Sequence, residues 1–153
     1  MGLFSFLFKE KPPTSRELKK KDLSVAGTYY YQNGIAKLAT LNKDYKSSAK
    51  TLLANDKSMH RIFQYHYVNK PVELIPEPQN KHDKNAIKVV IAGELVGYIP
   101  REECLQVKQI LDHSEIKYIS AHISGGKYKI VNSDGSIEKG SIDISINVRI
   151  AYV

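Results

Sequence analysis

A short polar segment gathers the side chains of this chain that could take part in chemistry. It spans residues 77–90 and reads EPQNKHDKNAIKVV, with Asn80, His82 and Asp83 close together just before an alternating apolar tract. Asn and Asp often close turns through their own backbone, which explains part of this composition. A carboxylate also accepts a hydrogen bond from a sugar hydroxyl, so Asp83 could contact the end of a nucleotide chain.

Tyrosines offer a second kind of contact. The chain has ten Tyr and no Trp, and Tyr29, Tyr30 and Tyr31 are consecutive. We expect residues 24–32 to form a strand, with Gly27 at a bulge, so that neighbouring phenol rings lie on opposite faces. Tyrosine suits half-buried strands, and composition alone favours that structural role. Exposed rings, with a carboxylate for a hydroxyl and an Arg for a phosphate, would instead suit a nucleotide end.

Catalysis has little support in the residue patterns. The sequence contains no glycine-rich phosphate loop, no nucleophilic Ser elbow and no paired histidine spacing for zinc. Cys104 is the single cysteine and follows Glu102 and Glu103, whose charges would raise its pKa, so we expect an inert buried thiol. A metal-dependent phosphodiesterase would need a second carboxylate near Asp83, and Glu77 is the nearby candidate. We therefore expect no enzyme activity, no metal and no cofactor.

The net charge of +7 points to a polyanionic partner, and its distribution is uneven. Residues 1–60 hold eleven Lys and Arg against five Asp and Glu, whereas residues 61–153 hold twelve against eleven. Residues 9–22 contain a Pro pair and a Lys run, which predict a polar linker. We therefore divide the chain into a basic N-terminal extension over residues 1–23 and one domain over residues 24–153.

Length and composition fit a single globular domain. The chain has 153 residues, and 42% of them are hydrophobic. One cysteine leaves no internal disulfide, which suits a cytoplasmic protein. An apolar patch at residues 3–8 is too short to span a bilayer, so we expect it to pack on the domain or to fray, without membrane association.

The expected elements are mainly strands. Residues 60–68 and 71–75 predict strands, and residues 86–99 predict a β-hairpin followed by a helix that begins at Pro100. Residues 35–54 predict one broken helix or two short ones. Two strands follow, over KYISAHI and KYKIV. The tail over residues 141–153 alternates most regularly, with one apolar face made by Ile142, Ile144, Ile146, Val148 and Ile150. We expect a mainly β fold with inserted helices (α+β), closed as a small barrel or half-barrel.

Two segments of the chain resemble a known family. LIPEPQNKHDKNAIKVVIAGELVGYIPRE, residues 74–102, is similar to the core signature of the HIRAN domain family, which runs Asp-x-Asn-Ala-Ile-x-Val and then Gly-x-x-Val-Gly-Tyr or Gly-His. VAGTYYYQ, residues 25–32, resembles the family's first strand. The resemblance covers residues 24–112 and makes residues 33–60 a helical insertion. It implies a modified OB-like β-barrel, in a stand-alone HIRAN protein of bacterial or phage type.

The resemblance also implies a function and a site. HIRAN domains that bind DNA hold the 3′-hydroxyl end of a single strand, in DNA repair or replication and without catalysis of their own. Tyr30, with Tyr29 beside it, would stack on the terminal bases, and Asp83 would accept a hydrogen bond from the hydroxyl. The complete expected site is Tyr29, Tyr30, Asn80, His82, Asp83, Tyr98 and Arg101.

These residues lead to two alternatives. In the first, the partner is single-stranded DNA with a free 3′ end, with a helicase or nuclease acting in trans. In the second, the chain is a protein-interaction scaffold that keeps the fold without a DNA-end pocket. The first requires Tyr30, His82 and Asp83 to converge on one exposed concave patch, whereas the second requires the three tyrosines to be buried.

Overall fold

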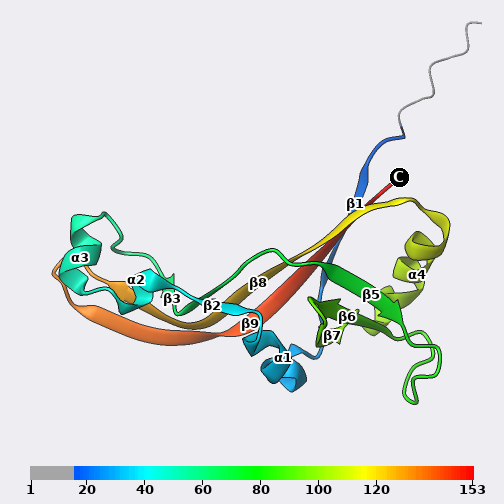
Figure 1. Cartoon of the computed structure of the whole chain (residues 1–153), viewed down its shortest axis with the longest axis horizontal. Helices are drawn as coiled ribbons and strands as arrows, with labels where there is room; N and C mark the ends of the chain where they lie inside the picture. The colour runs from blue at the N-terminus through cyan, green and yellow to red at the C-terminus, as the bar shows by residue number, and fades with distance from the viewer. Residues whose placement is uncertain (1–15) are drawn as a thin grey trace, which may run out of the picture.

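A long antiparallel hairpin runs the length of the molecule and carries the other elements at its two ends (Figure 1). The computed structural model describes residues 16–153. Their elements, in chain order, are β1 (Lys19–Ser24), the 3-10 helix η1 (Thr28–Tyr31), α1 (Gln32–Ala36), β2 (Ala39–Leu41), α2 (Lys43–Lys46), α3 (Ala49–Ala54), β3 (Ile62–Phe63), β4 (Tyr65–Tyr67), β5 (Val72–Pro76), β6 (Ile87–Ile91), β7 (Glu94–Tyr98), the 3-10 helix η2 (Arg101–Glu103), α4 (Cys104–His113), β8 (Ile116–Val131) and β9 (Ile137–Tyr152).

β9 confirms the strand expected over residues 141–153, and β8 joins the two strands that we expected over KYISAHI and KYKIV. Ile146 and Ile150 are buried in β9, while Ile142 is exposed because it lies beyond the main core. β8 continues through Gly125, where the pairing with β9 shifts its register. A side chain at Gly125 would collide with the backbone of Asp143, so glycine lets the two strands stay together through the irregularity.

The linker expected over residues 9–22 is wrong for residues 19–22, which belong to strand β1. Residues 19–22 belong to a strand that pairs with β9 along its whole length, and β1 therefore crosses the boundary that we placed at residue 24. Charged neighbours hold this edge strand, since Lys21 Nζ lies 2.9 Å from Glu103 Oε2 and Arg149 donates two hydrogen bonds to Asp22. The apolar patch at residues 3–8 lies outside the described residues.

The aromatic segment is not a strand, which corrects a second expectation. Gly27 adopts the left-handed conformation with φ of 75°, and Thr28–Tyr31 then form the 3-10 helix η1. The backbone N–H of Tyr30 donates to the carbonyl oxygen of Gly27 at 3.0 Å. Side chains of a 3-10 helix point in three directions, so the three phenol rings do not alternate between two faces.

The β5-β6-β7 sheet and α4 build one end of the molecule, and they contain the strand, hairpin and helix expected over residues 71–75, 86–99 and after Pro100. β6 and β7 form the hairpin expected over residues 86–99, and positive φ angles at Ala92 and Gly93 make its tight turn. η2 and α4 follow Pro100. The main core is formed by Leu23, Ile35, Leu38, Ile87, Val89, Ile91, Val96, Ile99, Cys104, Val107, Ile110, Ile146, Val148 and Ile150.

The other end of the molecule is an arm, made of residues 37–66 and the outer hairpin over residues 124–142. The helical region expected over residues 35–54 consists of α1, α2 and α3, with β2 between the first two. Leu52, Ile62 and Val131 form a small core of their own. The buried Lys129 ties β8 to the segment before α3, because its Nζ donates to the Ser47 carbonyl oxygen at 2.7 Å.

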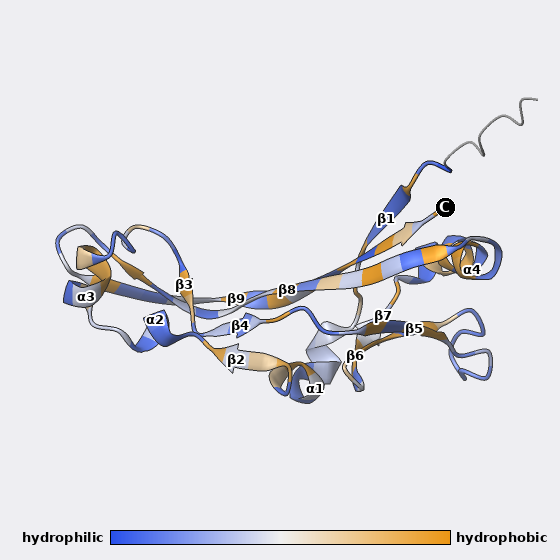
Figure 2. Cartoon of the chain, turned by 45° about the horizontal axis from the view of Figure 1, so that its top comes forward, coloured by the Kyte–Doolittle hydropathy of each residue, from blue (hydrophilic) through white to orange (hydrophobic). Residues whose placement is uncertain are grey.

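The expected class, mainly β with inserted helices, is confirmed, but the sheets stay open. β1-β9-β8-β3, β2-β4 and β5-β6-β7 form three sheets, and no closed barrel is present within residues 16–153. In Figure 2 α2 has the hydrophilic colour, while α3 and α4 carry hydrophobic stretches. No helix of the described part is long and apolar enough to cross a membrane.

Candidate nucleic-acid interface

An open cavity of about 410 Å³ lies where η1, the loop over residues 77–86 and the connection from β7 to α4 meet. We call it the loop cavity, and it is lined by Ala26, Tyr31, Asn80, His82, Asp83, Ala86, Tyr98, Ile99, Arg101 and Cys104. Its lining combines a carboxylate, a guanidinium and two phenol rings. These groups come from segments that are far apart in the sequence, so the fold creates the cavity.

The loop itself is built by the Asn and Asp side chains. Asn80 Oδ1 accepts hydrogen bonds from the backbone N–H groups of His82 and Asp83, at 2.9 and 3.0 Å. Asp83 Oδ1 in turn accepts from the N–H of Asn85 at 2.9 Å. Asn80 also donates to Glu77 Oε1 at 3.3 Å. The amide side chain of Asn80 and one oxygen of Asp83 are therefore used by the turn, which orients the carboxylate.

The other oxygen of Asp83 faces Arg101. Asp83 Oδ2 lies 3.7 Å from Arg101 Nε, which is an ion pair but too long for a hydrogen bond. The Asp83 side chain is 20% exposed, while that of Arg101 is 81% exposed. A ligand hydroxyl could therefore reach the carboxylate, and a ligand phosphate could reach the guanidinium.

Two phenol rings form the aromatic part of the cavity. The ring centroids of Tyr31 and Tyr98 are 6.1 Å apart, with the planes tilted by 50°. Burial raises the pKa of Tyr98 well above its ordinary value, and the Glu77 carboxylate and Tyr31 raise it further. The Tyr98 hydroxyl therefore stays protonated at neutral pH and can donate a hydrogen bond.

A close backbone contact brings η1 beside the loop cavity. Ala26 and Tyr98 exchange two backbone hydrogen bonds, of 2.7 and 2.9 Å. A Cβ atom at Gly97 would lie 2.5 Å from both the Ala26 carbonyl oxygen and Val25 Cγ1. Glycine at this position is what permits the approach, so Gly97 positions Tyr31 without touching the cavity.

The thiol that lines the cavity is buried, as expected. Cys104 is buried, and its Sγ donates to the carbonyl oxygens of Pro100 and Ile99 at 3.4 and 3.6 Å. Burial raises the pKa of the Cys104 thiol, and the carboxylates of Asp83 and Glu102 add to the rise. Within residues 16–153, no group of three or more His, Cys, Asp and Glu side chains could hold a metal ion.

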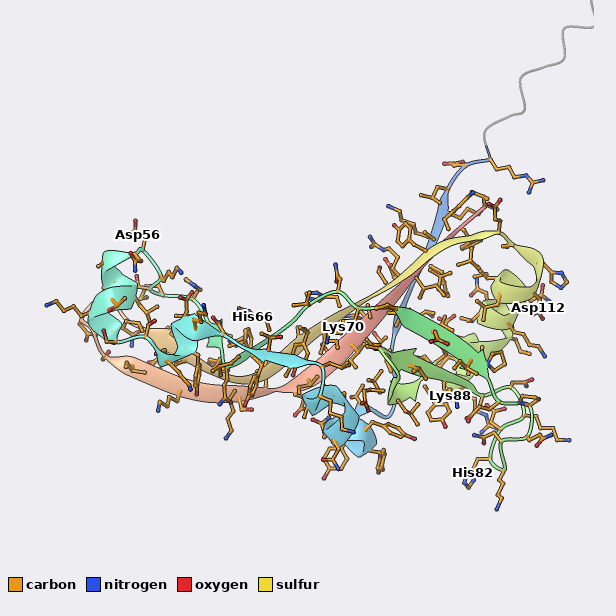
Figure 3. The ribbon with its side chains drawn as sticks, in the orientation of Figure 1. Asp56, His66, Lys70, His82, Lys88 and Asp112 are labelled. Atoms are coloured by element: carbon orange, nitrogen blue, oxygen red, sulfur yellow. The ribbon has the colours of Figure 1, made fainter. Side chains whose placement is uncertain are left out.

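Five of the seven expected site residues lie together, and two do not. The loop cavity is lined by Asn80, His82, Asp83, Tyr98 and Arg101. Tyr29 and Tyr30 are each 81% exposed on η1, with their rings edge-on and 5.6 Å apart. Tyr31, which was not among the expected residues, lines the cavity instead. Figure 3 shows His82 at the outer end of the loop and Lys88 in β6.

The convergence required of Tyr30, His82 and Asp83 is found for two of the three residues, because Tyr30 does not line the cavity. His82 and Asp83 share the loop cavity, and Tyr31 contributes the ring that we expected from Tyr30. Tyr29 and Tyr30 are not buried, although the scaffold alternative requires it. A glycine two residues before the first tyrosine was the sequence signal for a turn, because Gly27 alone of this segment adopts positive φ readily.

Comparison with known proteins identifies the family of this chain. The model of the HIRAN domain family matches residues 20–148, and the chain therefore belongs to the HIRAN domain family. The crystal structure of the HIRAN domain of human HLTF is similar to this chain with 17% sequence identity and a TM-score of 0.41, over 87% of this chain and 74% of that one. A search of curated proteins found no match. Family membership supports a DNA-binding module in general terms.

Proposed function

We propose that the loop cavity binds the 3′ end of single-stranded DNA, with the terminal hydroxyl against Asp83. The observation that supports this most directly is the convergence of Asp83, Arg101, Tyr31 and Tyr98 on one open cavity. Each group matches a different part of a strand end: a carboxylate for the hydroxyl, a guanidinium for a phosphate and rings for bases.

Selectivity for a hydroxyl end follows from the charge of Asp83. A hydroxyl donates a hydrogen bond to the open oxygen Oδ2, whereas a terminal phosphate would place negative charge against the carboxylate. Arg101 is exposed and can reach the phosphate that precedes the last sugar. Tyr29 and Tyr30 lie just outside the cavity and would stack on the bases that follow.

In a cell, such a module would act as a targeting factor in DNA repair or replication. It would bind strand ends in the cytoplasm without catalysis of its own and would bring a helicase or nuclease to them. These roles rest on the proposed preference for a free 3′ end, so that preference is the property to measure first.

The test is fluorescence anisotropy with one labelled single strand that ends in a 3′-hydroxyl or a 3′-phosphate. We expect the protein to prefer the hydroxyl by about tenfold or more, because a hydrogen bond to a charged acceptor contributes roughly 1.5–3 kcal/mol. Asp83→Asn should bind the hydroxyl end more weakly and the phosphate end no worse, so that the preference is lost. Its amide oxygen can still accept from Asn85, which keeps the loop intact.

Asp112→Asn is the matched control, because it makes the same chemical change on an exposed residue at the far end of α4 (Figure 3). It should keep the preference of the unmodified protein. Equal binding of both strand ends by the unmodified protein would rule out the proposal and favour the scaffold alternative.

A further inference from the structure

The arm carries most of the net positive charge of the described residues. Residues 37–66 and 124–142 hold nine Lys and Arg against four Asp and Glu, while the rest of residues 16–153 hold twelve against eleven. The fold therefore gathers at one end of the molecule a charge excess that is spread along the sequence. Exposed cations concentrated in this way attract a polyanion.

Three cavities connect the surroundings of the loop cavity to the arm. The first, of about 550 Å³, is lined by Tyr29 of η1 together with Lys127. The second, of about 450 Å³, shares Lys127 with the first, and it shares Tyr65 with the third, of about 430 Å³. Tyr29, in the first of these cavities, is two residues from Tyr31, which lines the loop cavity. The series of cavities therefore begins beside the proposed site for the strand end and continues along the arm.

The lining of these cavities includes the cations Lys127 and Arg61 and several aromatic rings, together with the carboxylates of Asp44 and Asp143. Lys127 is exposed, and Tyr65 is 42% exposed. The exposed Arg61 lies over the ring of Tyr128, with its guanidinium carbon 4.9 Å from the centroid. The third cavity also includes the histidines His60, His66 and His122, and Figure 3 shows His66 along the arm. Cations for phosphates between rings for bases are the composition of a surface that binds single strands.

We infer that the arm is a second binding surface, which holds the interior of the strand whose 3′ end occupies the loop cavity. The strand would leave the loop cavity past Tyr29 and Tyr30, follow the three cavities and place its phosphates near Lys127 and Arg61. This inference rests on the proposed function for the position of the end. It adds that affinity depends on nucleotides well beyond that end.

The experiment compares strands of about 5 and about 20 nucleotides with the same 3′-hydroxyl end, over a series of salt concentrations. Binding of the longer strand should be tighter and more dependent on salt, because each contact with a single-strand phosphate adds about 0.7 to the logarithmic salt slope. Lys127→Glu should weaken binding of the longer strand about fivefold and lower its slope, while binding of the shorter strand stays constant. Arg61→Glu should act in the same way.

Lys70→Glu is the control, since it makes the same charge change at an exposed residue between β4 and β5 that lies outside the three cavities (Figure 3). Thermal melting of each variant verifies that it is folded. Equal affinity for both strand lengths, or equal effects of Lys127→Glu and Lys70→Glu, would overturn the inference and leave an acidic protein segment as the partner of the arm. Loss of the hydroxyl preference alone would instead remove the proposed end recognition.

Discussion

Asp83 divides its two oxygens between structure and binding. Oδ1 accepts the N–H of Asn85 and closes the turn, while Oδ2 faces the cavity at 3.7 Å from Arg101. The turn fixes the direction of the carboxylate before a ligand arrives, so little conformational entropy is lost on binding. The position of the polar loop just before β6 serves this purpose, because β6 fixes one end of the turn that orients the carboxylate.

Tyr98 links the cavity to the alkaline stability of the protein. Burial raises its pKa in the folded state above the ordinary value near 10.0. At high pH the unfolded chain loses the phenol proton while the folded chain keeps it, so the stability is full below pH 10 and falls as the pH rises further.

Tyr98→Phe removes the titrating phenol. We therefore expect the free energy of unfolding of this variant to fall less steeply above pH 10 than that of the unmodified protein. Tyr67 and Cys104 have pKa values shifted in the same direction, so part of the slope should remain. Urea denaturation at a series of alkaline pH values measures the difference. Identical pH slopes in the two proteins would contradict the assignment.

At the scale of the elements, Gly97 is the position on which the contact between η1 and β7 depends. We expect Gly97→Ala to destabilise the fold by about 2–4 kcal/mol, because the added methyl group would meet the backbone of Ala26. The displaced η1 would also move Tyr31 and weaken binding of the strand end.

Gly93→Ala is the comparison for this prediction. Gly93 has a positive φ of 82° in the β6–β7 turn, but a Cβ atom there would meet nothing within 4 Å. The cost should therefore be about 1–2 kcal/mol, from the backbone conformation alone. Chemical denaturation of both variants measures the difference, and equal losses would show that the close approach at Gly97 does not matter.

The elements that the sequence predicts best are those specified by adjacent residues. The hairpin over residues 86–99 combines alternating apolar positions with Gly93, and Pro100 marks the start of the helical segment after it. Asp83 lies just before this hairpin and Tyr98 at its end, but both were expected in the site because of the family resemblance. η1 was missed because Gly27 fits a bulge and a turn equally well, and tertiary contacts with β7 decide between them.

Strands with long-range partners were also predicted poorly. The charged residues of β1 indicate a linker, and only pairing with β9 at the other end of the sequence makes them a strand. The division between the loop cavity and the outer rings of Tyr29 and Tyr30 depends on the rotation of η1, which no local pattern specifies.

On the scale of the whole molecule, two hydrophobic cores share one hairpin. The main core lies under β6, β7 and α4, whereas the arm depends on Leu52, Ile62 and Val131. Because the small core has three buried members, the loss of one should open the arm without unfolding the rest.

We expect Leu52→Ala to cost the arm about 2–4 kcal/mol, since it removes a fully buried Leu side chain. Amide hydrogen exchange should become faster in α3 and β3 and stay slow in β6, β7 and α4. Binding of a short strand end should persist, whereas the added affinity for a long strand should fall. Uniformly faster exchange would mean that the two cores unfold as one unit.

The pairing of Lys19 with Tyr152 puts the start of β1 beside the end of β9, at the end of the molecule away from the arm (Figure 1). A circular permutant that links these neighbouring strand ends and is opened at the Asn132–Gly135 turn would keep all three sheets. For the same reason, a fluorescent protein fused after Val153 would emerge away from the arm. The domain can therefore be inserted, tethered or displayed with the loop cavity and the arm turned to the solvent.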